Sequence, residues 1–133
     1  METAPAQRQA AILFADIAGS TRLYETLGDA EALATITRAL DLIRQVCEEH
    51  GGRIVKTIGD EAMAIFPNAA NAAYASITMQ TQVSGMKTSR GAPLSIHAGF
   101  HYGPVIEASK DVFGDSVNLA ARLTSLAKAS QTL

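Results

Sequence analysis

The sequence predicts one α+β domain in which helices pack on one face of a largely antiparallel sheet. Short apolar runs typical of strands alternate with longer segments in which apolar residues recur every three or four positions. Most of the strand-like runs come in adjacent pairs joined by short turns, which favours antiparallel pairing. A chain of 133 residues suits a single hydrophobic core. We expect residues 1–9 to be an N-terminal extension and residues 10–133 to form the domain.

Composition indicates a folded protein that binds neither nucleic acid nor membrane. Apolar residues make up 47% of the chain and charged residues 18%, and the net charge is −2, so no basic surface is expected. No run approaches the roughly 20 apolar residues that span a bilayer, and the first residues lack a secretory signal pattern. We therefore expect a cytoplasmic domain without membrane contact, and leave a membrane segment open for a longer parent protein. The single cysteine, Cys47, is interpreted as a small buried residue.

The first half of the chain contains one strand and two helices. Residues 10–17 are apolar except for one acid near the end, which is typical of a buried strand that carries Asp16 to its carboxyl tip. A turn then leads into a short helix that ends at Gly28. A longer helix follows, with Asp29 as its expected cap and apolar residues at helical spacing as far as Val46.

A hairpin is expected next, from strands at residues 53–58 and 61–66. Gly59 and Asp60 separate them and suit a two-residue turn with Asp60 at its tip. Strict alternation assigns the side chains to two faces. One face carries Ile54, Lys56, Ile58, Met63 and Ile65, and the other carries Val55, Thr57, Ala62, Ala64 and Phe66. The domain's own helices can cover one face, so a partner subunit is the expected cover for the other.

The remaining elements are a helix, a second pair of strands and a final helix. Helical spacing extends over residues 69–85. Strands are expected at residues 93–102 and 104–109, with Gly103-Pro104 as the break between them. Residues 114–128 form the last helix.

Asp16 and Asp60 are candidate metal ligands. Taken singly, Asp16 is explained as a helix N-cap and Asp60 as a turn residue. A strand end and a hairpin tip can lie side by side in one sheet, however, and paired carboxylates hold Mg²⁺ together with substrate phosphates. Repulsion between two such acids requires a cation nearby.

Lys56, Asn118 and Arg122 are candidate ligand contacts. Lys56 stands on an apolar face, either as a lysine whose amine reaches water past its neighbours or as a donor to the polar edge of a ligand. Asn118 and Arg122 are four residues apart in the last helix and therefore share a face. A guanidinium suits a phosphate oxygen because it donates two hydrogen bonds, and a solvated surface arginine is the alternative. The three histidines lack zinc-ligand spacing and are interpreted as structural or surface residues: His50, His97 and His101.

Four segments resemble successive motifs of the class III adenylyl and guanylyl cyclases of the bacterial type: LFADIAGST, GGRIVKTIGDEAMAIF, HAGFHYGPV and DVFGDSVNLAARL. They occur in the family's order and cover most of residues 11–128. The resemblance implies a ferredoxin-like, palm-type sandwich. It also implies an adenylate cyclase, a signal-transduction lyase that converts ATP to 3′,5′-cyclic AMP and pyrophosphate in sites shared across a homodimer.

The resemblance assigns the metal and phosphate ligands position by position. Asp16 and Asp60, with the backbone carbonyl of Ile17, would bind two Mg²⁺ or Mn²⁺ ions per site. Backbone N–H groups at a helix start would hold the triphosphate. The residues of that turn are Ala18, Gly19, Ser20 and Thr21.

The resemblance also assigns the residues that recognise the base and stabilise the transition state. Lys56 would donate to adenine N1 and Asp111 would accept from the adenine amino group, whereas guanine presents the opposite pattern. Asn118 would orient the ribose. Arg122 would stabilise charge at the α-phosphate.

One departure from the family pattern, and two related families, define the alternatives. The family pattern continues through a further segment that supplies a lysine to the terminal phosphates, and no residue here matches it, so we expect a C-terminally shortened domain. A catalytically weak or inactive nucleotide-binding or dimerisation module is therefore one alternative. A guanylate cyclase is another, disfavoured by Lys56 and Asp111. A diguanylate cyclase is disfavoured because its Gly-Gly-Asp/Glu-Glu-Phe hairpin is absent at residues 58–62. Regulatory domains are expected in a longer parent protein.

Overall fold

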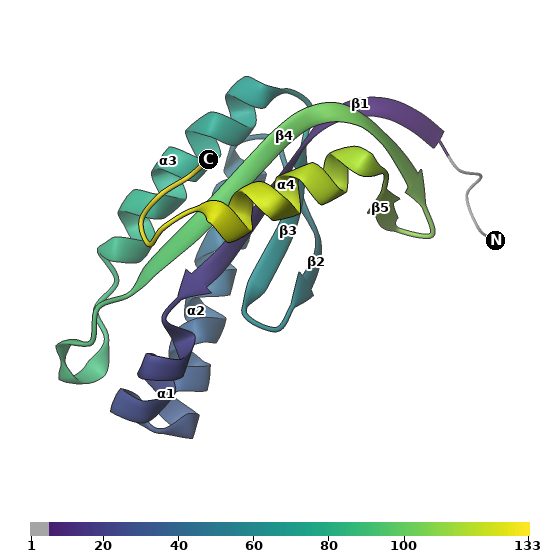
Figure 1. The fold of residues 1–133 in the computed structure, drawn as a ribbon. Coiled ribbons are helices and arrows are strands. Elements are labelled where there is room, and N and C mark those ends of the chain that lie inside the picture. The colour runs from purple at the N-terminus through teal and green to yellow at the C-terminus, as the bar shows by residue number, and fades with distance from the viewer. Residues whose placement is uncertain (1–5) are drawn as a thin grey trace.

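The computed structural model describes residues 6–133, and within them a five-stranded sheet and four α-helices (Figure 1). The strands are β1 (Ala6–Ala18), β2 (Arg53–Ile58), β3 (Glu61–Phe66), β4 (Ser95–Ala108) and β5 (Asp111–Phe113). The helices are α1 (Ser20–Leu27), α2 (Asp29–Glu49), α3 (Ala69–Ser84) and α4 (Asp115–Leu126). The two helices of the first half and the first hairpin lie where the sequence predicts them, whereas β1 is longer than the predicted residues 10–17.

The sheet has the order β2-β3-β1-β4-β5, and each neighbouring pair is antiparallel. This confirms the α+β class with an antiparallel sheet. The central strand β1 is apolar on both sides, because both faces of the sheet are covered.

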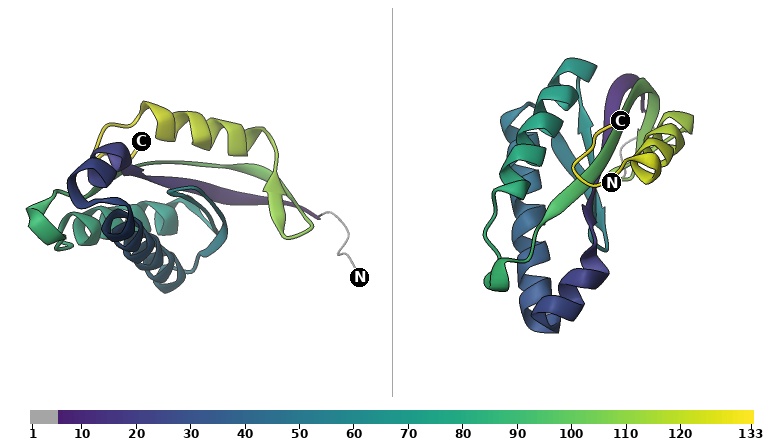
Figure 2. Two further views of the ribbon diagram at one scale, coloured as in Figure 1. Left: turned by 90° about the horizontal axis from the view of Figure 1, so that it is seen from below. Right: turned by 60° about the vertical axis from the view of Figure 1, so that its left-hand side comes forward.

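The helices divide between the two faces (Figure 2). On one face, apolar side chains of α1, α2 and α3 pack against the sheet and form the larger core. On the other face α4 lies across β4 and β1 and closes a smaller core that contains Ile12, Met63 and Val105. The prediction of helices on one face therefore holds for three helices and is wrong for α4. The spacing of apolar residues in α4 does not indicate which face of the sheet the helix covers.

Two glycines of β4 let α4 lie directly on the strand. A Cβ atom at Gly99 would stand 2.5 Å from the backbone nitrogen of Thr124, which is closer than real Cβ atoms approach. A Cβ atom at Gly103 would collide with the hydroxyl of Ser116. A larger residue at Gly99 would meet the backbone of α4 and push the helix off the strand, whereas a larger residue at Gly103 would require the Ser116 side chain to move.

The β2–β3 hairpin differs from the predicted alternation at one point. The register shifts between Ile54 and Lys56, so Ile54 packs with the larger core and Val55 with the smaller one. The expectation that a partner subunit covers the second face is wrong for Met63 and Ile65, which are buried within the chain. Their cover is the smaller core beneath α4.

The predicted break at Gly103-Pro104 is also wrong. β4 continues through these residues, and the chain reverses instead at Ser109 and Lys110, which both have positive φ. Such turns normally carry Gly or Asn, so the sequence gave no turn signal at these two residues.

Both ends of the described chain pair with β4. β1 begins at Ala6, so the strand reaches into the expected N-terminal extension, and its first residues pair with β4. Backbone hydrogen bonds also join residues 130–133 to β4.

As expected, Cys47 is buried, and burial raises the pKa of its thiol to about 12. None of the helices in residues 6–133 is long and apolar enough to cross a membrane.

Candidate active site

Four ionisable side chains meet where β1 ends. In the sheet register, Asp16 of β1 lies between Glu61 of β3 and His97 of β4. The β2–β3 turn reaches the same end of the sheet, where the Ile17 amide donates to the Asp60 carbonyl over 3.3 Å (Figure 1). The two predicted metal ligands, Asp16 and Asp60, therefore lie together. We call Asp16, Asp60, Glu61 and His97 the acid cluster.

Burial, and after it the charge of neighbouring acids, disfavours the ionised form of the carboxyl groups in the acid cluster. Burial raises the pKa of Asp16 to about 6, and the hydrogen-bonding contact and charge of Asp60 and the charge of Glu61 act in the same direction. Burial also raises the pKa of Glu61, with Asp60 adding to the effect and His97 opposing it. One oxygen of Asp16, Oδ1, is buried and receives no hydrogen bond from any residue in the described part of the chain.

These observations fit a cation. A buried carboxylate oxygen without a donor is costly unless a positive charge meets it. Carboxylate oxygens of Asp16 and Asp60, with a backbone carbonyl, are the hard oxygen donors that Mg²⁺ and Mn²⁺ prefer. No group of three or more His, Cys, Asp or Glu side chains within residues 6–133 is arranged to hold a metal. Completing the coordination would therefore require backbone, water or substrate oxygens.

Asp16 is not a helix cap. The N-cap of α1 is Gly19, which lies in the left-handed region, and no side chain caps the helix. The first N–H groups of a helix have no intrahelical partner, so the predicted phosphate-binding turn keeps donors for an anion. A cavity of about 260 Å³ opens beside Ala18 and Gly19.

The structure also brings together Lys56 and Asp111, which are 55 residues apart in the chain. Lys56 Nζ donates to Asp111 Oδ2 over 2.9 Å, although β2 and β5 are the two edges of the sheet. Hydrogen bonds from Lys56 and from the Val112 amide lower the pKa of Asp111. Nearby, Arg53 of β2 pairs with Glu107 of β4 at 3.0 Å, so a second ion pair joins strands that are not neighbours in the sheet.

Asn118 and Arg122 lie on the exposed side of α4, as predicted, while Ala120 faces the smaller core. Within residues 6–133 neither side chain makes a hydrogen bond or an ion pair with another residue. No such bond joins Asp16 or Asp60 to either of them. The predicted site side chains therefore lie in three sets: Asp16 and Asp60 in the acid cluster, Lys56 with Asp111, and Asn118 and Arg122 on α4.

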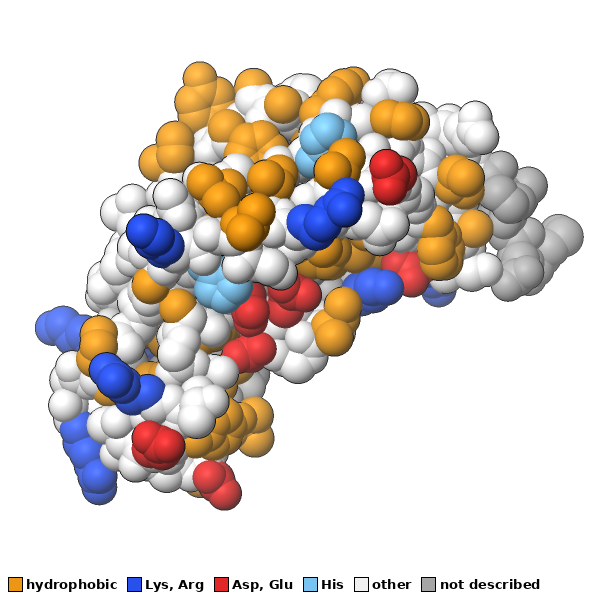
Figure 3. Space-filling view, in the orientation of Figure 1, with side chains coloured by type: hydrophobic (Ala, Val, Ile, Leu, Met, Phe, Trp, Pro, Cys, Tyr) orange, Lys and Arg blue, Asp and Glu red, His pale blue; other side chains and the backbone are white. Residues whose placement is uncertain are grey.

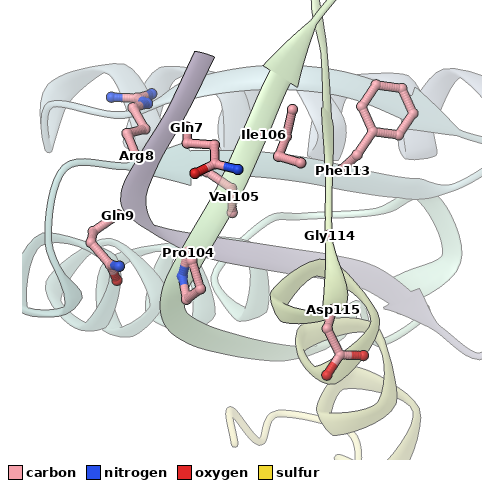
Figure 4. A pocket seen from close by; sticks show the side chains of 9 residues that line it. All are labelled: Gln7, Arg8, Gln9, Pro104, Val105, Ile106, Phe113, Gly114 and Asp115. Carbon is pink, nitrogen blue, oxygen red and sulfur yellow. The ribbon is translucent and has the colours of Figure 1, made fainter. Parts of the chain in front are cut away.

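Several acidic side chains gather beside a histidine on the face seen in Figure 3. A cavity of about 440 Å³ lies elsewhere, among the first residues of β1, the far end of β4, and the start of α4 (Figure 4). Phe113 and Ile106 give it an apolar wall, and it contains none of the predicted site residues. We do not assign the site to it.

Sequence reasoning missed two members of the acid cluster. The sequence pattern places Glu61 only as the first residue of a strand, and it predicts a structural or surface role for His97. Both are placed beside Asp16 by the register of strands far apart in the sequence. A local pattern contains no signal for that register.

Comparison with known proteins gives the family. The profile described as "Adenylate and Guanylate cyclase catalytic domain" matches residues 2–133. The adenylate cyclase of Streptomyces coelicolor is 36% identical over 121 residues, covering 90% of this chain and 30% of that protein. The adenylate cyclase of Anabaena cylindrica is 33% identical over 143 residues, covering 94% of this chain and 28% of that protein. The chain thus spans less than a third of the length of these curated relatives.

A solved structure agrees in fold. The adenylate/guanylate cyclase/hydrolase from Silicibacter pomeroyi has a TM-score of 0.83 and 30% identity, covering 97% of this chain and 76% of that one. The profile spans nearly the whole sequence, and the fold agrees with it. The chain therefore belongs to the adenylate and guanylate cyclase catalytic domain family.

Proposed function

We propose that the protein is an adenylate cyclase that converts ATP to 3′,5′-cyclic AMP and pyrophosphate, with two divalent cations in each of two sites shared between two copies of the chain. The observation that carries the proposal is the pairing of an uncompensated acid cluster with a separate Lys56–Asp111 pair in a member of this family. The first is suited to cations and the second to a purine.

Asp16 and Asp60 would hold the cations, with the backbone carbonyl of Ile17 as a further ligand. Bound Mg²⁺ or Mn²⁺ would lower the pKa of the ribose 3′-hydroxyl and neutralise charge on the triphosphate. The turn from Ala18 to Thr21 would bind phosphate oxygens through N–H groups that the uncapped helix α1 leaves free.

The Lys56–Asp111 pair would select adenine. Lysine donates only, so it suits the N1 acceptor of adenine, and an ionised aspartate accepts from the amino group. The lowered pKa of Asp111 keeps it ionised and therefore an acceptor at neutral pH. Guanine presents a donor at N1 and an acceptor at O6, so both contacts would be mismatched.

Asn118 and Arg122 would act on the sugar and the reacting phosphate. The ribose 3′-oxygen attacks the α-phosphorus in line, a new O–P bond forms, the bond to the bridging oxygen breaks, and pyrophosphate leaves. The hydroxyl proton is released, and no protein nucleophile takes part. Asn118 would orient the ribose. Arg122 would stabilise the charge that develops at the α-phosphate, where a bidentate donor is most effective.

A site shared between two copies of the chain follows if the acid cluster of one copy faces Asn118 and Arg122 of the other copy. Asn118 and Arg122 are exposed on α4 and have no partner within residues 6–133, so a second copy can present its acid cluster to them. Exposed apolar side chains offer a surface for that association. Among them are Ile58, Tyr102, Phe113 and Leu126.

The test is a product assay beside a binding titration. The purified protein is incubated with ATP or GTP and Mn²⁺ or Mg²⁺, cyclic nucleotides are quantified by mass spectrometry, and nucleotide binding is measured by calorimetry. We expect cyclic AMP in excess over cyclic GMP. Nucleotide binding without turnover would identify a nucleotide-binding module instead, and cyclic GMP as the main product would identify a guanylate cyclase.

A further inference from the structure

His97 contacts both a metal-ligand candidate and the last helix. Its Nδ1 lies 2.8 Å from the Thr124 carbonyl oxygen on α4, and its Nε2 lies 3.3 Å from Asp16 Oδ2 on β1. The imidazole therefore bridges two elements that sheet pairing does not join.

The two contacts determine where protons must lie around the ring. A carbonyl oxygen only accepts, so Nδ1 must carry a proton and donate it to Thr124. Nε2 then faces a carboxyl oxygen, and that contact is attractive only with a proton between the two atoms. Whether that proton resides on the imidazole or on Asp16, the Oδ2 atom of Asp16 is engaged by His97.

The oxygens of Asp16 are thus divided between two tasks. Oδ2 meets His97, whereas Oδ1 is buried and receives no donor from the described residues. We propose that His97 is a positioning residue, which holds Asp16 by Oδ2 so that Oδ1 remains available to a divalent cation. The inference rests on the proposed function, since it concerns the same cation site. Groups that hydrogen-bond to metal ligands set ligand orientation and affinity.

The other end of the bridge is a rigid anchor. Thr124 is buried, its hydroxyl donates to the Ala120 carbonyl over 2.9 Å, and the backbone of Gly99 packs against it too closely for any Cβ. The Thr124 carbonyl lies in the last turn of α4, where it also accepts from the Ala127 amide over 3.2 Å. A carbonyl oxygen has two lone pairs and can accept from His97 as well, and a donor is favourable at a helix C-terminus. His97 is therefore held by a fixed point of the helix that carries Arg122.

Three substitutions separate the two contacts. His97→Asn keeps an N–H near the position of Nδ1 and loses the reach to Asp16, while His97→Gln keeps an N–H near the position of Nε2 and loses the bond to Thr124. His97→Phe keeps the ring and loses both. His101→Phe is the matched control, because His101 lies half-buried on the same strand and makes no hydrogen bond with any residue from 6 to 133.

The readout is binding of Mn²⁺ alone, titrated by electron paramagnetic resonance without nucleotide, with circular dichroism to verify folding. We expect His97→Asn and His97→Phe to weaken Mn²⁺ binding by roughly 10-fold or more, the range for groups that support metal ligands. His97→Gln should stay within about threefold of the wild type, and His101→Phe should be unchanged. If His97→Phe fails to fold, the comparison of His97→Asn with His97→Gln still decides.

Asp16→Asn separates this inference from the proposed function. Loss of Mn²⁺ binding in Asp16→Asn together with wild-type binding in His97→Asn would overturn the positioning role and leave the cation site intact. Wild-type Mn²⁺ binding in Asp16→Asn would overturn the cation site itself, and the role of His97 with it.

Discussion

The acid cluster and the Lys56–Asp111 pair are both built from charged side chains, but only one of them balances its charge. Three acids meet one histidine in the acid cluster, and the pKa values of Asp16 and Glu61 are raised. In the Lys56–Asp111 pair, Lys56 Nζ and Asp111 Oδ2 lie 2.9 Å apart and their charges neutralise each other, and the pKa of Asp111 is lowered.

The difference indicates what each region requires. The acid cluster is incomplete without a cation, because its like charges repel in a partly buried setting. The Lys56–Asp111 pair is complete by itself and is already oriented, so it can exchange one hydrogen-bond partner for a base edge with little rearrangement. Removal of an acid should therefore affect the chemistry, whereas changes in the pair should affect the choice of base.

The largest effect is expected for Asp60→Ala. Loss of one of two metal-ligand side chains should lower cyclic AMP formation by roughly 100-fold or more, because the cations would lose a ligand at the reacting phosphate. Steady-state rates with Mn²⁺-ATP measure this. Asp41→Ala on the exposed side of α2 is the control and should retain activity. Undiminished activity in Asp60→Ala would contradict the two-metal site.

A smaller effect is expected when the base-recognising pair is exchanged. Lys56→Glu combined with Asp111→Cys replaces the donor and the acceptor, and should shift the ATP:GTP ratio of kcat/KM toward GTP by roughly 10-fold or more. The matched control is Arg44→Glu, which reverses a charge in an exposed ion pair on α2. If the ratio is unchanged, these two residues do not select the base.

The smallest effect concerns stability without cations. The pKa of Asp16 is about 6 in the folded protein and 3.8 ordinarily, so the folded state binds more protons between these values. Its contribution to stability is full below pH 4 and is lost as pH rises through about 6, by on the order of 1–2 kcal/mol after solvent screening.

Denaturant unfolding in a chelator at pH 4 to 7 measures this contribution, and Asp16→Asn should flatten the profile. Adding Mn²⁺ at pH 7 should restore stability to the wild type and not to Asp16→Asn. A wild-type profile that rises with pH more steeply than that of Asp16→Asn would contradict the assignment.

Local signals in the sequence predicted most of the fold. Helical spacing, glycine stops and the Gly59-Asp60 turn located the helices of the first half and the first hairpin. The predictions were wrong where the chain departs from a local sequence rule, such as strict strand alternation or the use of Gly and Asn in tight turns. The irregularity after Ile54 exchanged two side chains between faces, and the turn at Ser109 and Lys110 carries neither Gly nor Asn.

The candidate site was predictable in composition and not in arrangement. Motif resemblance indicated Asp16, Asp60, Lys56 and Asp111. The contact between Lys56 and Asp111 joins opposite edges of the sheet, which no local pattern encodes. His97 became visible only when strand register placed it beside Asp16 and helix packing placed Thr124 above it.

The most direct test of the account is complementation between two inactive variants. Asp16→Ala removes the metal half of the site and Arg122→Ala the transition-state half, so each should be inactive alone. In a mixed dimer one site carries both changes and the other carries neither. Random mixing at equal concentrations should therefore restore about a quarter of wild-type cyclic AMP formation. No recovery despite mixed dimers verified by native mass spectrometry would contradict the shared site.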